Sequence, residues 1–128
     1  MTEAGANLAL VVGAWTAMSR SGSTDALASI LDDDVVWQGL RPELVCRNRT
    51  DVLDLISRHR GTVSQVTQIE AAEFGDRVAV SVRGPSFADD GLLPKGAPRS
   101  LVFTFRDGRV VRMDSLASRD AAFELAAR

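Results

Sequence analysis

The chain has 128 residues, of which 45% are apolar and 25% are charged, and its 15 basic and 17 acidic side chains give a formal net charge of −2 with the one histidine neutral. This composition excludes an intrinsically disordered chain and is typical of one globular domain spanning residues 1–128. Near-neutral charge without a basic stripe gives no electrostatic reason to expect nucleic-acid binding. Cys46 is the only cysteine, so an intramolecular disulfide and a cysteine-based zinc site are excluded, and nothing indicates an oxidising compartment.

The start of the chain lacks the pattern of an export or membrane signal. Its longest apolar run, Leu8 to Val12, is far shorter than the ~20 residues that a membrane span requires. No basic region precedes that run, as one would in a signal peptide. We therefore expect a cytoplasmic protein that does not bind membranes.

Hydrophobic periodicity predicts two helices at the start of the chain. From Ala6 to Met18 the apolar residues recur every three or four positions, and Trp15 lies on the inward face. After a turn rich in serine, Ser23 or Thr24 is expected to cap a second short helix that runs through Leu31.

A short strand follows that second helix. Three aspartates at 32–34 read as a solvated turn, because successive carboxylates point in different directions and lack further ligands at metal spacing. Residues 35–39 then alternate as a strand with Trp37 and Gly39 on the interior face.

A third helix and a first hairpin come next. Thr50 is expected to cap a helix that runs to about Arg60, with Ile56 and His59 on its inward face. Residues 62–74 and 77–83 read as two strands joined by a tight turn. The loop from Gly84 to Pro98 is long for a compact domain and is a candidate lid.

A second hairpin and a final helix complete the chain. Asp107-Gly108 predicts a type I′ turn between strands at 100–106 and 109–117, and Ser118 is expected to cap a helix at 119–127. Period-two alternation gives two sets of side chains on this hairpin. The inward set is Leu101, Phe103, Phe105, Val111, Met113 and Ser115. The outward apolar set is Val102, Thr104, Val110 and Leu116, which suggests a partner surface.

This order of elements predicts an α+β fold with the helices segregated from the sheet. In the segments VVGAWTAMSRSGSTDALASILDDDVVWQG, RNRTDVLDLISRH and FRDGRVVRMDSLASRDAAFE, the chain resembles the superfamily of nuclear transport factor 2, ketosteroid isomerase and SnoaL-like polyketide cyclases. The resemblance implies a cone: a curved, antiparallel (mixed) sheet wrapped around three helices of the N-terminal half. It also implies an apolar pocket on the concave side and a homodimer through the outer sheet face.

The pocket is expected to bind a small hydrophobic molecule without a cofactor or metal. Inward-facing residues supply enough aromatic and flexible surface to line such a cavity. The expected lining is Trp15, Met18, Trp37, Gly39, Ile56, His59, Leu101, Phe103, Phe105, Met113 and Ser115.

The catalytic residues of the resembled enzymes do not transfer to this chain. Ketosteroid isomerases use a carboxylate base, a tyrosine and a protonated aspartic acid, whose positions align here with Gly39, Trp15 and Leu101. Glycine cannot abstract a proton and leucine cannot donate a hydrogen bond. The histidine and aspartate of the polyketide cyclases align with Leu101 and Ser115. The first hypothesis is therefore a binding protein.

Two alternatives remain open. An isomerase, cyclase or dehydratase would use His59 as its acid or base, with Ser115, Gln38 or a tryptophan N–H polarising an oxygen. A protein-interaction module would instead fill its own pocket and use the sheet face for a partner.

Other polar residues give weaker indications of a functional role. Asp114 has outward parity, where Arg112 can pair with it. Cys46 stands beside a basic residue that could lower its thiol pKa, although a structural role is favoured. Glu70 and Glu73 lie on opposite faces of one strand, and we treat both as surface residues.

Overall fold

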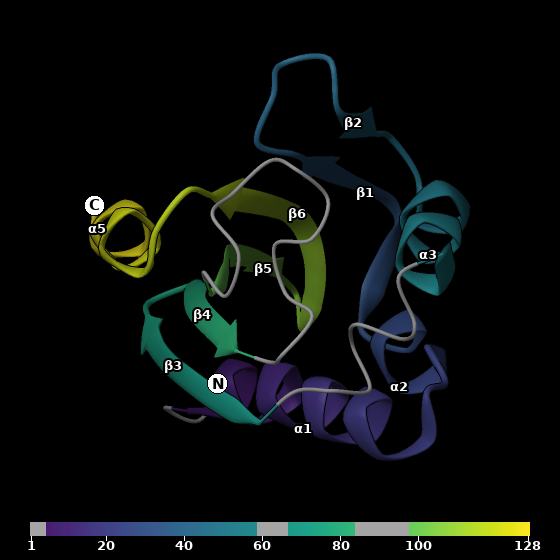
Figure 1. Ribbon diagram of the computed structural model, residues 1–128, viewed down its shortest axis with the longest axis horizontal. Coiled ribbons are helices and arrows are strands. Elements are labelled where there is room, and N and C mark those ends of the chain that lie inside the picture. The colour runs from purple at the N-terminus through teal and green to yellow at the C-terminus, as the bar shows by residue number, and fades with distance from the viewer. Residues whose placement is uncertain (1–4, 59–66, 84–97) are drawn as a thin grey trace.

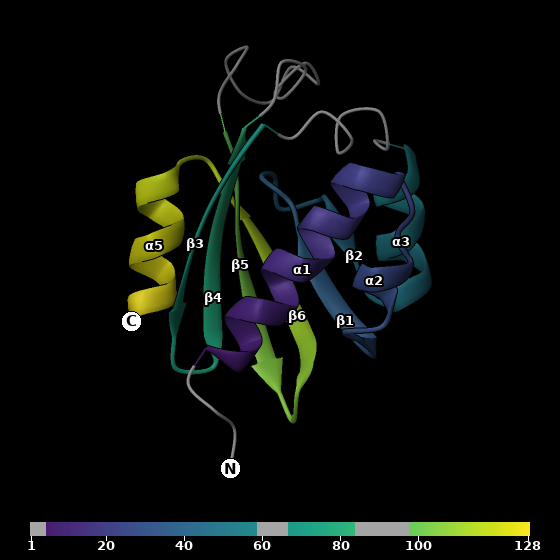
Figure 2. The same ribbon diagram turned by 90° about the horizontal axis from the view of Figure 1, so that it is seen from below.

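The computed structural model describes residues 5–58, 67–83 and 98–128. These residues form a curved sheet that wraps around α1, α2 and α3 and carries α5 on its convex side (Figure 1, Figure 2). The elements are α1 (Ala6–Ser21), α2 (Asp25–Ala28), β1 (Leu31–Gln38), β2 (Val45–Cys46), α3 (Arg49–Arg58), β3 (Gln68–Phe74), β4 (Arg77–Arg83), β5 (Arg99–Arg106), β6 (Arg109–Leu116) and α5 (Arg119–Ala127). No helix among them is both long and apolar enough to cross a membrane.

Within the described residues the strands form one open, mixed sheet in the order β2-β1-β6-β5-β4-β3. β1 and β6 pair in parallel, and the other neighbouring strands pair antiparallel. Asp107 and Gly108 have positive φ angles of 54° and 79°, as a type I′ turn requires. The predicted cone-shaped α+β fold and both hairpins are confirmed.

The first strand and its flanking helices differ from the prediction. β1 begins at Leu31, which with Val35 is fully buried, so burial of these side chains extends the strand through the three aspartates at 32–34. Asp33 forms an ion pair with Arg49 of α3 at 2.9 Å. The prediction that the aspartates form a turn was wrong, and α2 is correspondingly shorter.

Asn48, rather than Thr50, caps α3. Its Oδ1 accepts the backbone N–H of Asp51 at 2.8 Å, and its Nδ2 donates to the Asp51 carboxylate at 3.2 Å. Because α3 begins at Arg49, Thr50 already lies inside the helix, where its side chain cannot act as the N-cap.

A bulge in the last hairpin reverses the predicted faces of two valines. Thr104 pairs with Arg112 while Phe105 pairs with Val110, which leaves Val111 as an extra residue in β6. Val110 is fully buried in the core, whereas Val111 is half-buried. Val111 was predicted to face inward and Val110 outward. Both predictions were wrong, because the extra residue of a bulge interrupts the alternation of side chains between the two faces of the sheet.

The chain's own C-terminal helix covers part of the outer sheet face. Ala122 and Ala126 of α5 pack against Ala79 of β4 and Val102 of β5, with Leu116 at the edge of this cluster. As predicted, Ser118 caps the helix, its Oγ accepting the backbone N–H of Ala121 at 3.1 Å. Of the residues that suggested a partner, Val102 and Leu116 therefore pack beneath α5, and Val110 is buried in the core. The homodimer stays a prediction.

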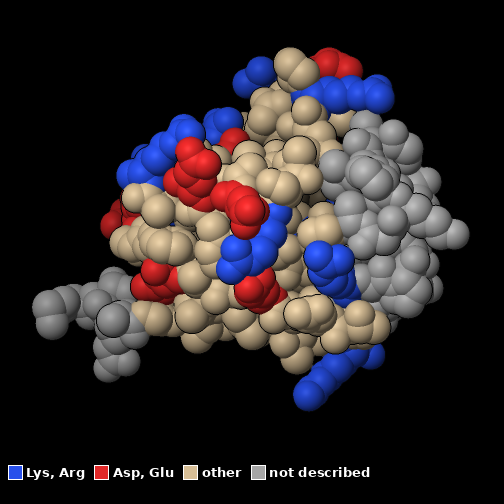
Figure 3. Space-filling view, turned by 60° about the vertical axis from the view of Figure 1, so that its left-hand side comes forward, with Lys and Arg blue, Asp and Glu red and all other residues tan. Residues whose placement is uncertain are grey.

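Polar contacts also anchor α5 to the strands beneath it. Arg119 forms an ion pair with Glu70 of β3 and lies 4.2 Å from the ring centroid of Phe123. Phe123 in turn meets Phe74 edge-on, with the ring centroids 6.2 Å apart. Arg77 of β4 donates to the carbonyl oxygen of Leu125 at 2.9 Å. On this side of the molecule, acidic and basic side chains lie next to one another (Figure 3).

Candidate functional site

Two rows of side chains cross the concave face of the sheet. In the first row, Trp37 of β1 lies beside Met113 of β6, which lies beside Phe103 of β5. In the second row, nearer the end at which β6 finishes, Ser115 lies beside Leu101. The register thus brings together inward residues that are far apart in the sequence.

The helices complete this concave cluster. Trp15 and Met18 of α1 are buried in the same apolar cluster as Leu101, Phe103, Phe105 and Met113, while Trp37 and Ile56 pack against it and stay half-buried. Met18, Phe103 and Met113 are at most 3% exposed, so they are core residues. The accessible part of the concave face is formed by the half-buried residues.

Trp37 is fixed in place by a hydrogen bond and by a glycine. Its indole N–H donates to Oγ of Ser115 at 3.1 Å, a contact between β1 and β6. A Cβ atom on Gly39 would lie 2.6 Å from Cη2 of Trp37 and 2.8 Å from Cβ of Leu44. Gly39 is therefore the residue that lets the Trp37 ring lie where it does. A carboxylate side chain at position 39 would collide with that ring.

Trp15 buries a polar atom that has no partner. The residue is 9% exposed, and its indole N–H is the one buried side-chain nitrogen or oxygen in the described part of the chain that makes no hydrogen bond. Such a group costs about 1–3 kcal/mol when it is removed from water without an acceptor. The helix spacing identified Trp15 as inward-facing, but the sequence contained no sign that its N–H would lack a partner.

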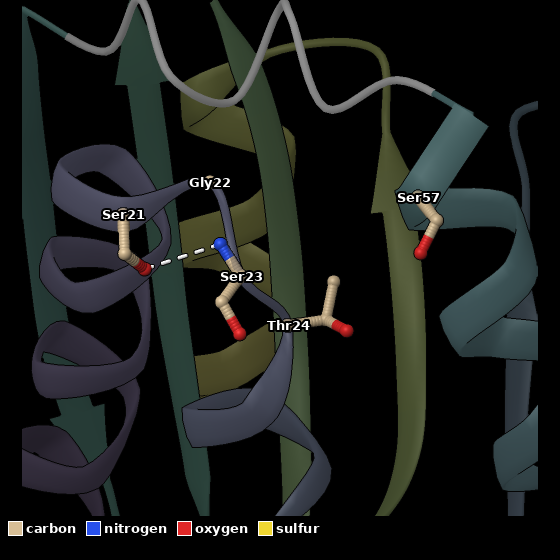
Figure 4. Close-up of a pocket in the computed structure, with 5 residues that line it drawn as sticks. All are labelled: Ser21, Gly22, Ser23, Thr24 and Ser57. Carbon is tan, nitrogen blue, oxygen red and sulfur yellow. Dashed lines mark hydrogen bonds between the residues drawn. The ribbon is translucent and has the colours of Figure 1, made fainter.

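A depression of about 250 Å³ lies between the α1–α2 connection and the end of α3. Ser21, Gly22, Ser23 and Thr24 form one wall, and Ser57 lies across from them (Figure 4). The hydroxyl of Ser21 accepts the backbone N–H of Ser23 at 3.1 Å. The sequence predicts a turn here, with Ser23 or Thr24 as a helix cap, but contains no sign that Ser57 lies beside these residues.

Gln38 and Asp114 each make hydrogen bonds within the protein. The side-chain amide of Gln38 donates to the carbonyl oxygen of Arg41 at 3.0 Å and thereby holds the loop between β1 and β2. Arg112 donates from Nε to both carboxylate oxygens of Asp114 at 3.0 Å. The predicted outward pairing of Asp114 is confirmed.

Cys46 is a partly buried free thiol beside the first row. It lies on β2 opposite Trp37 and packs against the concave cluster. Burial raises the pKa of the Cys46 thiol, the negative charge of Asp51 raises it further, and the positive charge of Arg58 lowers it. The thiol is therefore less nucleophilic than an ordinary cysteine, which agrees with the favoured structural role.

Two predicted features fall where the structure gives no description. His59, proposed as acid or base, lies outside the described residues, and so do residues 84–97 of the candidate lid. Of the other expected lining residues, Gly39 lies beside Trp37, Ser115 lies beside Leu101, and the rest belong to the apolar cluster between the helices and the sheet or pack against it. That they line a ligand pocket stays a prediction.

No protein-family model and no curated protein sequence matches the chain. Solved structures do match over almost its whole length. Bal32a, from a soil-derived mobile gene cassette, has a TM-score of 0.71 and 21% identity over 99% of this chain and 100% of its own. A putative polyketide cyclase from Xanthomonas campestris has a TM-score of 0.64 and 20% identity over 96% and 97%. An NTF-2 like protein of unknown function from Burkholderia xenovorans has a TM-score of 0.63 and 21% identity over 88% and 83%. The chain therefore has the curved-sheet cone fold of nuclear transport factor 2-like and polyketide cyclase-like proteins.

Proposed function

We propose that the protein binds a small, mostly apolar molecule on the concave face of its sheet, between α1, α3 and the inner rows of β1, β5 and β6. The observation that supports this most directly is the buried N–H of Trp15, which has no acceptor among the described residues. Buried donors in native proteins are almost always paired with protein, water or ligand. A bound molecule with an acceptor would supply the missing partner in this apolar cluster.

Half-buried apolar surface supports the same function. Trp37, Leu53 and Ile56 pack against the core yet remain partly exposed. Burying such surface against a ligand contributes roughly 25 cal/mol per Å². Aromatic and aliphatic side chains with a few polar groups among them are the usual lining of a small-molecule site.

Binding is favoured over catalysis because the concave face offers no free carboxylate among the described residues. Glu73 faces this side of β3, but its two oxygens accept the backbone N–H groups of Gly5 and Leu8. At the positions where ketosteroid isomerases hold their base and second acid, this chain has Gly39 and Leu101, which perform no proton transfer.

Native mass spectrometry tests the proposal, first under gentle and then under dissociating conditions. We expect the wild-type protein to carry a small organic molecule or to take one up from a panel of apolar compounds. Ser115→Phe adds volume to the concave face and should abolish the bound species. Thr104→Phe adds a similar side chain on the convex face and should leave it intact. Equal binding by both variants, or no binding by the wild-type protein, contradicts the proposal.

A further inference from the structure

We infer that the outer face of α1 is an interface between two copies of this chain, whose α1 helices pack antiparallel about a two-fold axis at Gly13. The residues of this face recur at the three- and four-residue spacing of a helix and lie opposite the buried side of α1: Ala6, Ala9, Leu10, Gly13, Thr16, Ala17 and Arg20. Such a dimer does not depend on a bound ligand, and it uses α1 instead of the outer sheet face.

The outer face of α1 is exposed yet uncharged over most of its length. No charged residue occurs from Ala6 to Ser19, although Ala9, Leu10 and Gly13 are exposed. Leu10 is the one large hydrophobic side chain that is exposed in the described part of the chain. Figure 2 shows α1 in front of the sheet, with its outer side toward the viewer. A helix that is apolar on all sides is typical of a helix that is covered on all sides.

Two other helices of the protein have the charged outer surface that is usual beside water. The exposed side chains of α3 and α5 include acidic and basic ones: Asp51, Asp54, Arg58, Arg119, Asp120 and Glu124. Because α1 has no such side chains before Arg20, contact with solvent alone does not account for its outer face.

Gly13 is an exposed glycine in the middle of α1, where glycine destabilises a helix relative to alanine. A Cβ atom on Gly13 would meet nothing within 4 Å, so packing within the chain does not require a glycine here. Ala9 and Ala17 lie about one turn to either side on the same face. Since the distance between packed helices depends on the side chains at the contact, these small residues allow a second helix to come close.

Charge complementarity favours a second copy in the antiparallel direction. In a pair centred on Gly13, Arg20 lies opposite Ala6 of the second copy, next to the carboxylate of Glu73 that caps the N-terminal end of α1. Arg20 is exposed and makes no ion pair with another described residue. The two-fold axis forms this contact twice. A parallel pair would instead place Arg20 against Arg20 and align the two helix dipoles.

The composition of α1 argues against a lipid surface, and the size of the face predicts a weak dimer. Helices that lie on membranes carry several lysines or arginines on their polar side, whereas α1 has only Arg20. A contact one helix wide is smaller than the usual interface of a stable dimer. We therefore expect reversible association with a dissociation constant on the order of 10 µM.

Sedimentation velocity of the full chain measures this association. The mass should rise from 13.7 kDa toward twice that value between about 1 and 300 µM protein. Leu10→Glu places a charge in the apolar contact of both copies and should raise the dissociation constant more than about ten-fold. Thr50→Glu adds the same charge at an exposed position of α3 and should change it less than about two-fold. Circular dichroism checks that both variants fold.

Disulfide trapping tests the antiparallel direction, with Cys46→Ser as the background because Cys46 is the only cysteine. Gly13→Cys should give a cross-linked dimer on mild oxidation, since the two copies of residue 13 meet at the axis. Ala9→Cys alone should not, because its two copies would lie about 12 Å apart along the helices, beyond the ~7 Å reach of a disulfide. A mixture of Ala9→Cys and Ala17→Cys should form the mixed disulfide.

Three results would overturn the inference. The first is a chain that stays monomeric at the highest concentration, whether or not α1 binds lipid vesicles or another protein. The second is a dimer that Leu10→Glu leaves intact, because its interface would then lie elsewhere, for example on the outer sheet face. The third is efficient cross-linking by Ala9→Cys alone, which would show a parallel pair.

Discussion

The carboxylate of Glu73 on β3 accepts the backbone N–H of Leu8 at 2.7 Å and so caps the N-terminal end of α1, although the two residues are 65 positions apart in the sequence. The same carboxylate accepts the N–H of Gly5 at 3.1 Å. Gly5 is the N-cap residue and has no side chain that could do this. A negative charge at this end also interacts favourably with the helix dipole.

Glu73→Gln should therefore destabilise the fold by about 1 kcal/mol, the usual value of a helix cap. Urea unfolding followed by circular dichroism measures the change as a lower midpoint at unchanged slope. Glu70→Gln, on the convex face of the same strand, is the matched control. Its ion pair with Arg119 is exposed, so the control should change the midpoint less. An equal effect of the two variants would show that Glu73 is not a cap.

Two glycine-to-alanine changes should have opposite signs. Gly39→Ala places a Cβ 2.6 Å from Cη2 of Trp37 and 2.8 Å from Cβ of Leu44, and overpacking of this kind costs about 1–3 kcal/mol. Gly13→Ala meets nothing within 4 Å on the exposed side of α1, and it should stabilise the helix by about 0.5–1 kcal/mol. Thermal unfolding of both variants measures this difference. A tolerated Gly39→Ala would mean that the Trp37 ring moves easily.

Cys46 should react slowly with thiol reagents. Burial and the charge of Asp51 raise the pKa of its thiol above the ordinary value, so little thiolate is present at neutral pH. We expect iodoacetamide to modify Cys46 more slowly in the folded protein than in the urea-unfolded protein. In the folded protein, the alkylation rate should continue to increase with pH even beyond the pH at which an ordinary thiol is fully ionised. Asp51→Asn should lower the pKa and increase the rate. Because the chain has one cysteine, mass spectrometry of the intact protein follows the reaction directly. A folded protein that reacts as fast as the unfolded one would rule out the raised pKa.

The attachment of α5 should weaken in acid. The hydrogen bond from Arg119 lowers the pKa of Glu70, with the positive charges of Arg119 and Arg83 acting in the same direction. A carboxylate whose pKa is lower in the folded state contributes stability above its unfolded pKa, near 4.3 for glutamate. That contribution is lost as the pH falls through the folded value. A carbon-13 NMR titration of Glu70 should thus give a pKa below the ordinary value, and Arg119→Gln should return it toward that value. An unchanged titration in the variant would exclude Arg119 as the cause.

Local sequence patterns predicted the features that depend on neighbouring residues. Asp107-Gly108 adopts the positive φ angles of a hairpin turn because these residues tolerate them. Ser118 caps α5 because its hydroxyl reaches the backbone three residues on. In the candidate site, helix and strand periodicity placed Trp15, Met18 and Leu101 in the interior, since a one-sided core imposes those periods.

Only the tertiary structure decided the features that join distant segments. The bulge at Val111, the capping of α1 by Glu73 and the hydrogen bond from Trp37 to Ser115 each depend on register between strands or on a helix crossing a strand. No short window of sequence contains both partners of such a contact. The sequence by itself thus determined the fold class, most of the elements and most of the inward faces, but not β2 or the faces of Val110 and Val111. The packing of distant elements decided which polar groups find partners, and it left the N–H of Trp15 without one among the described residues.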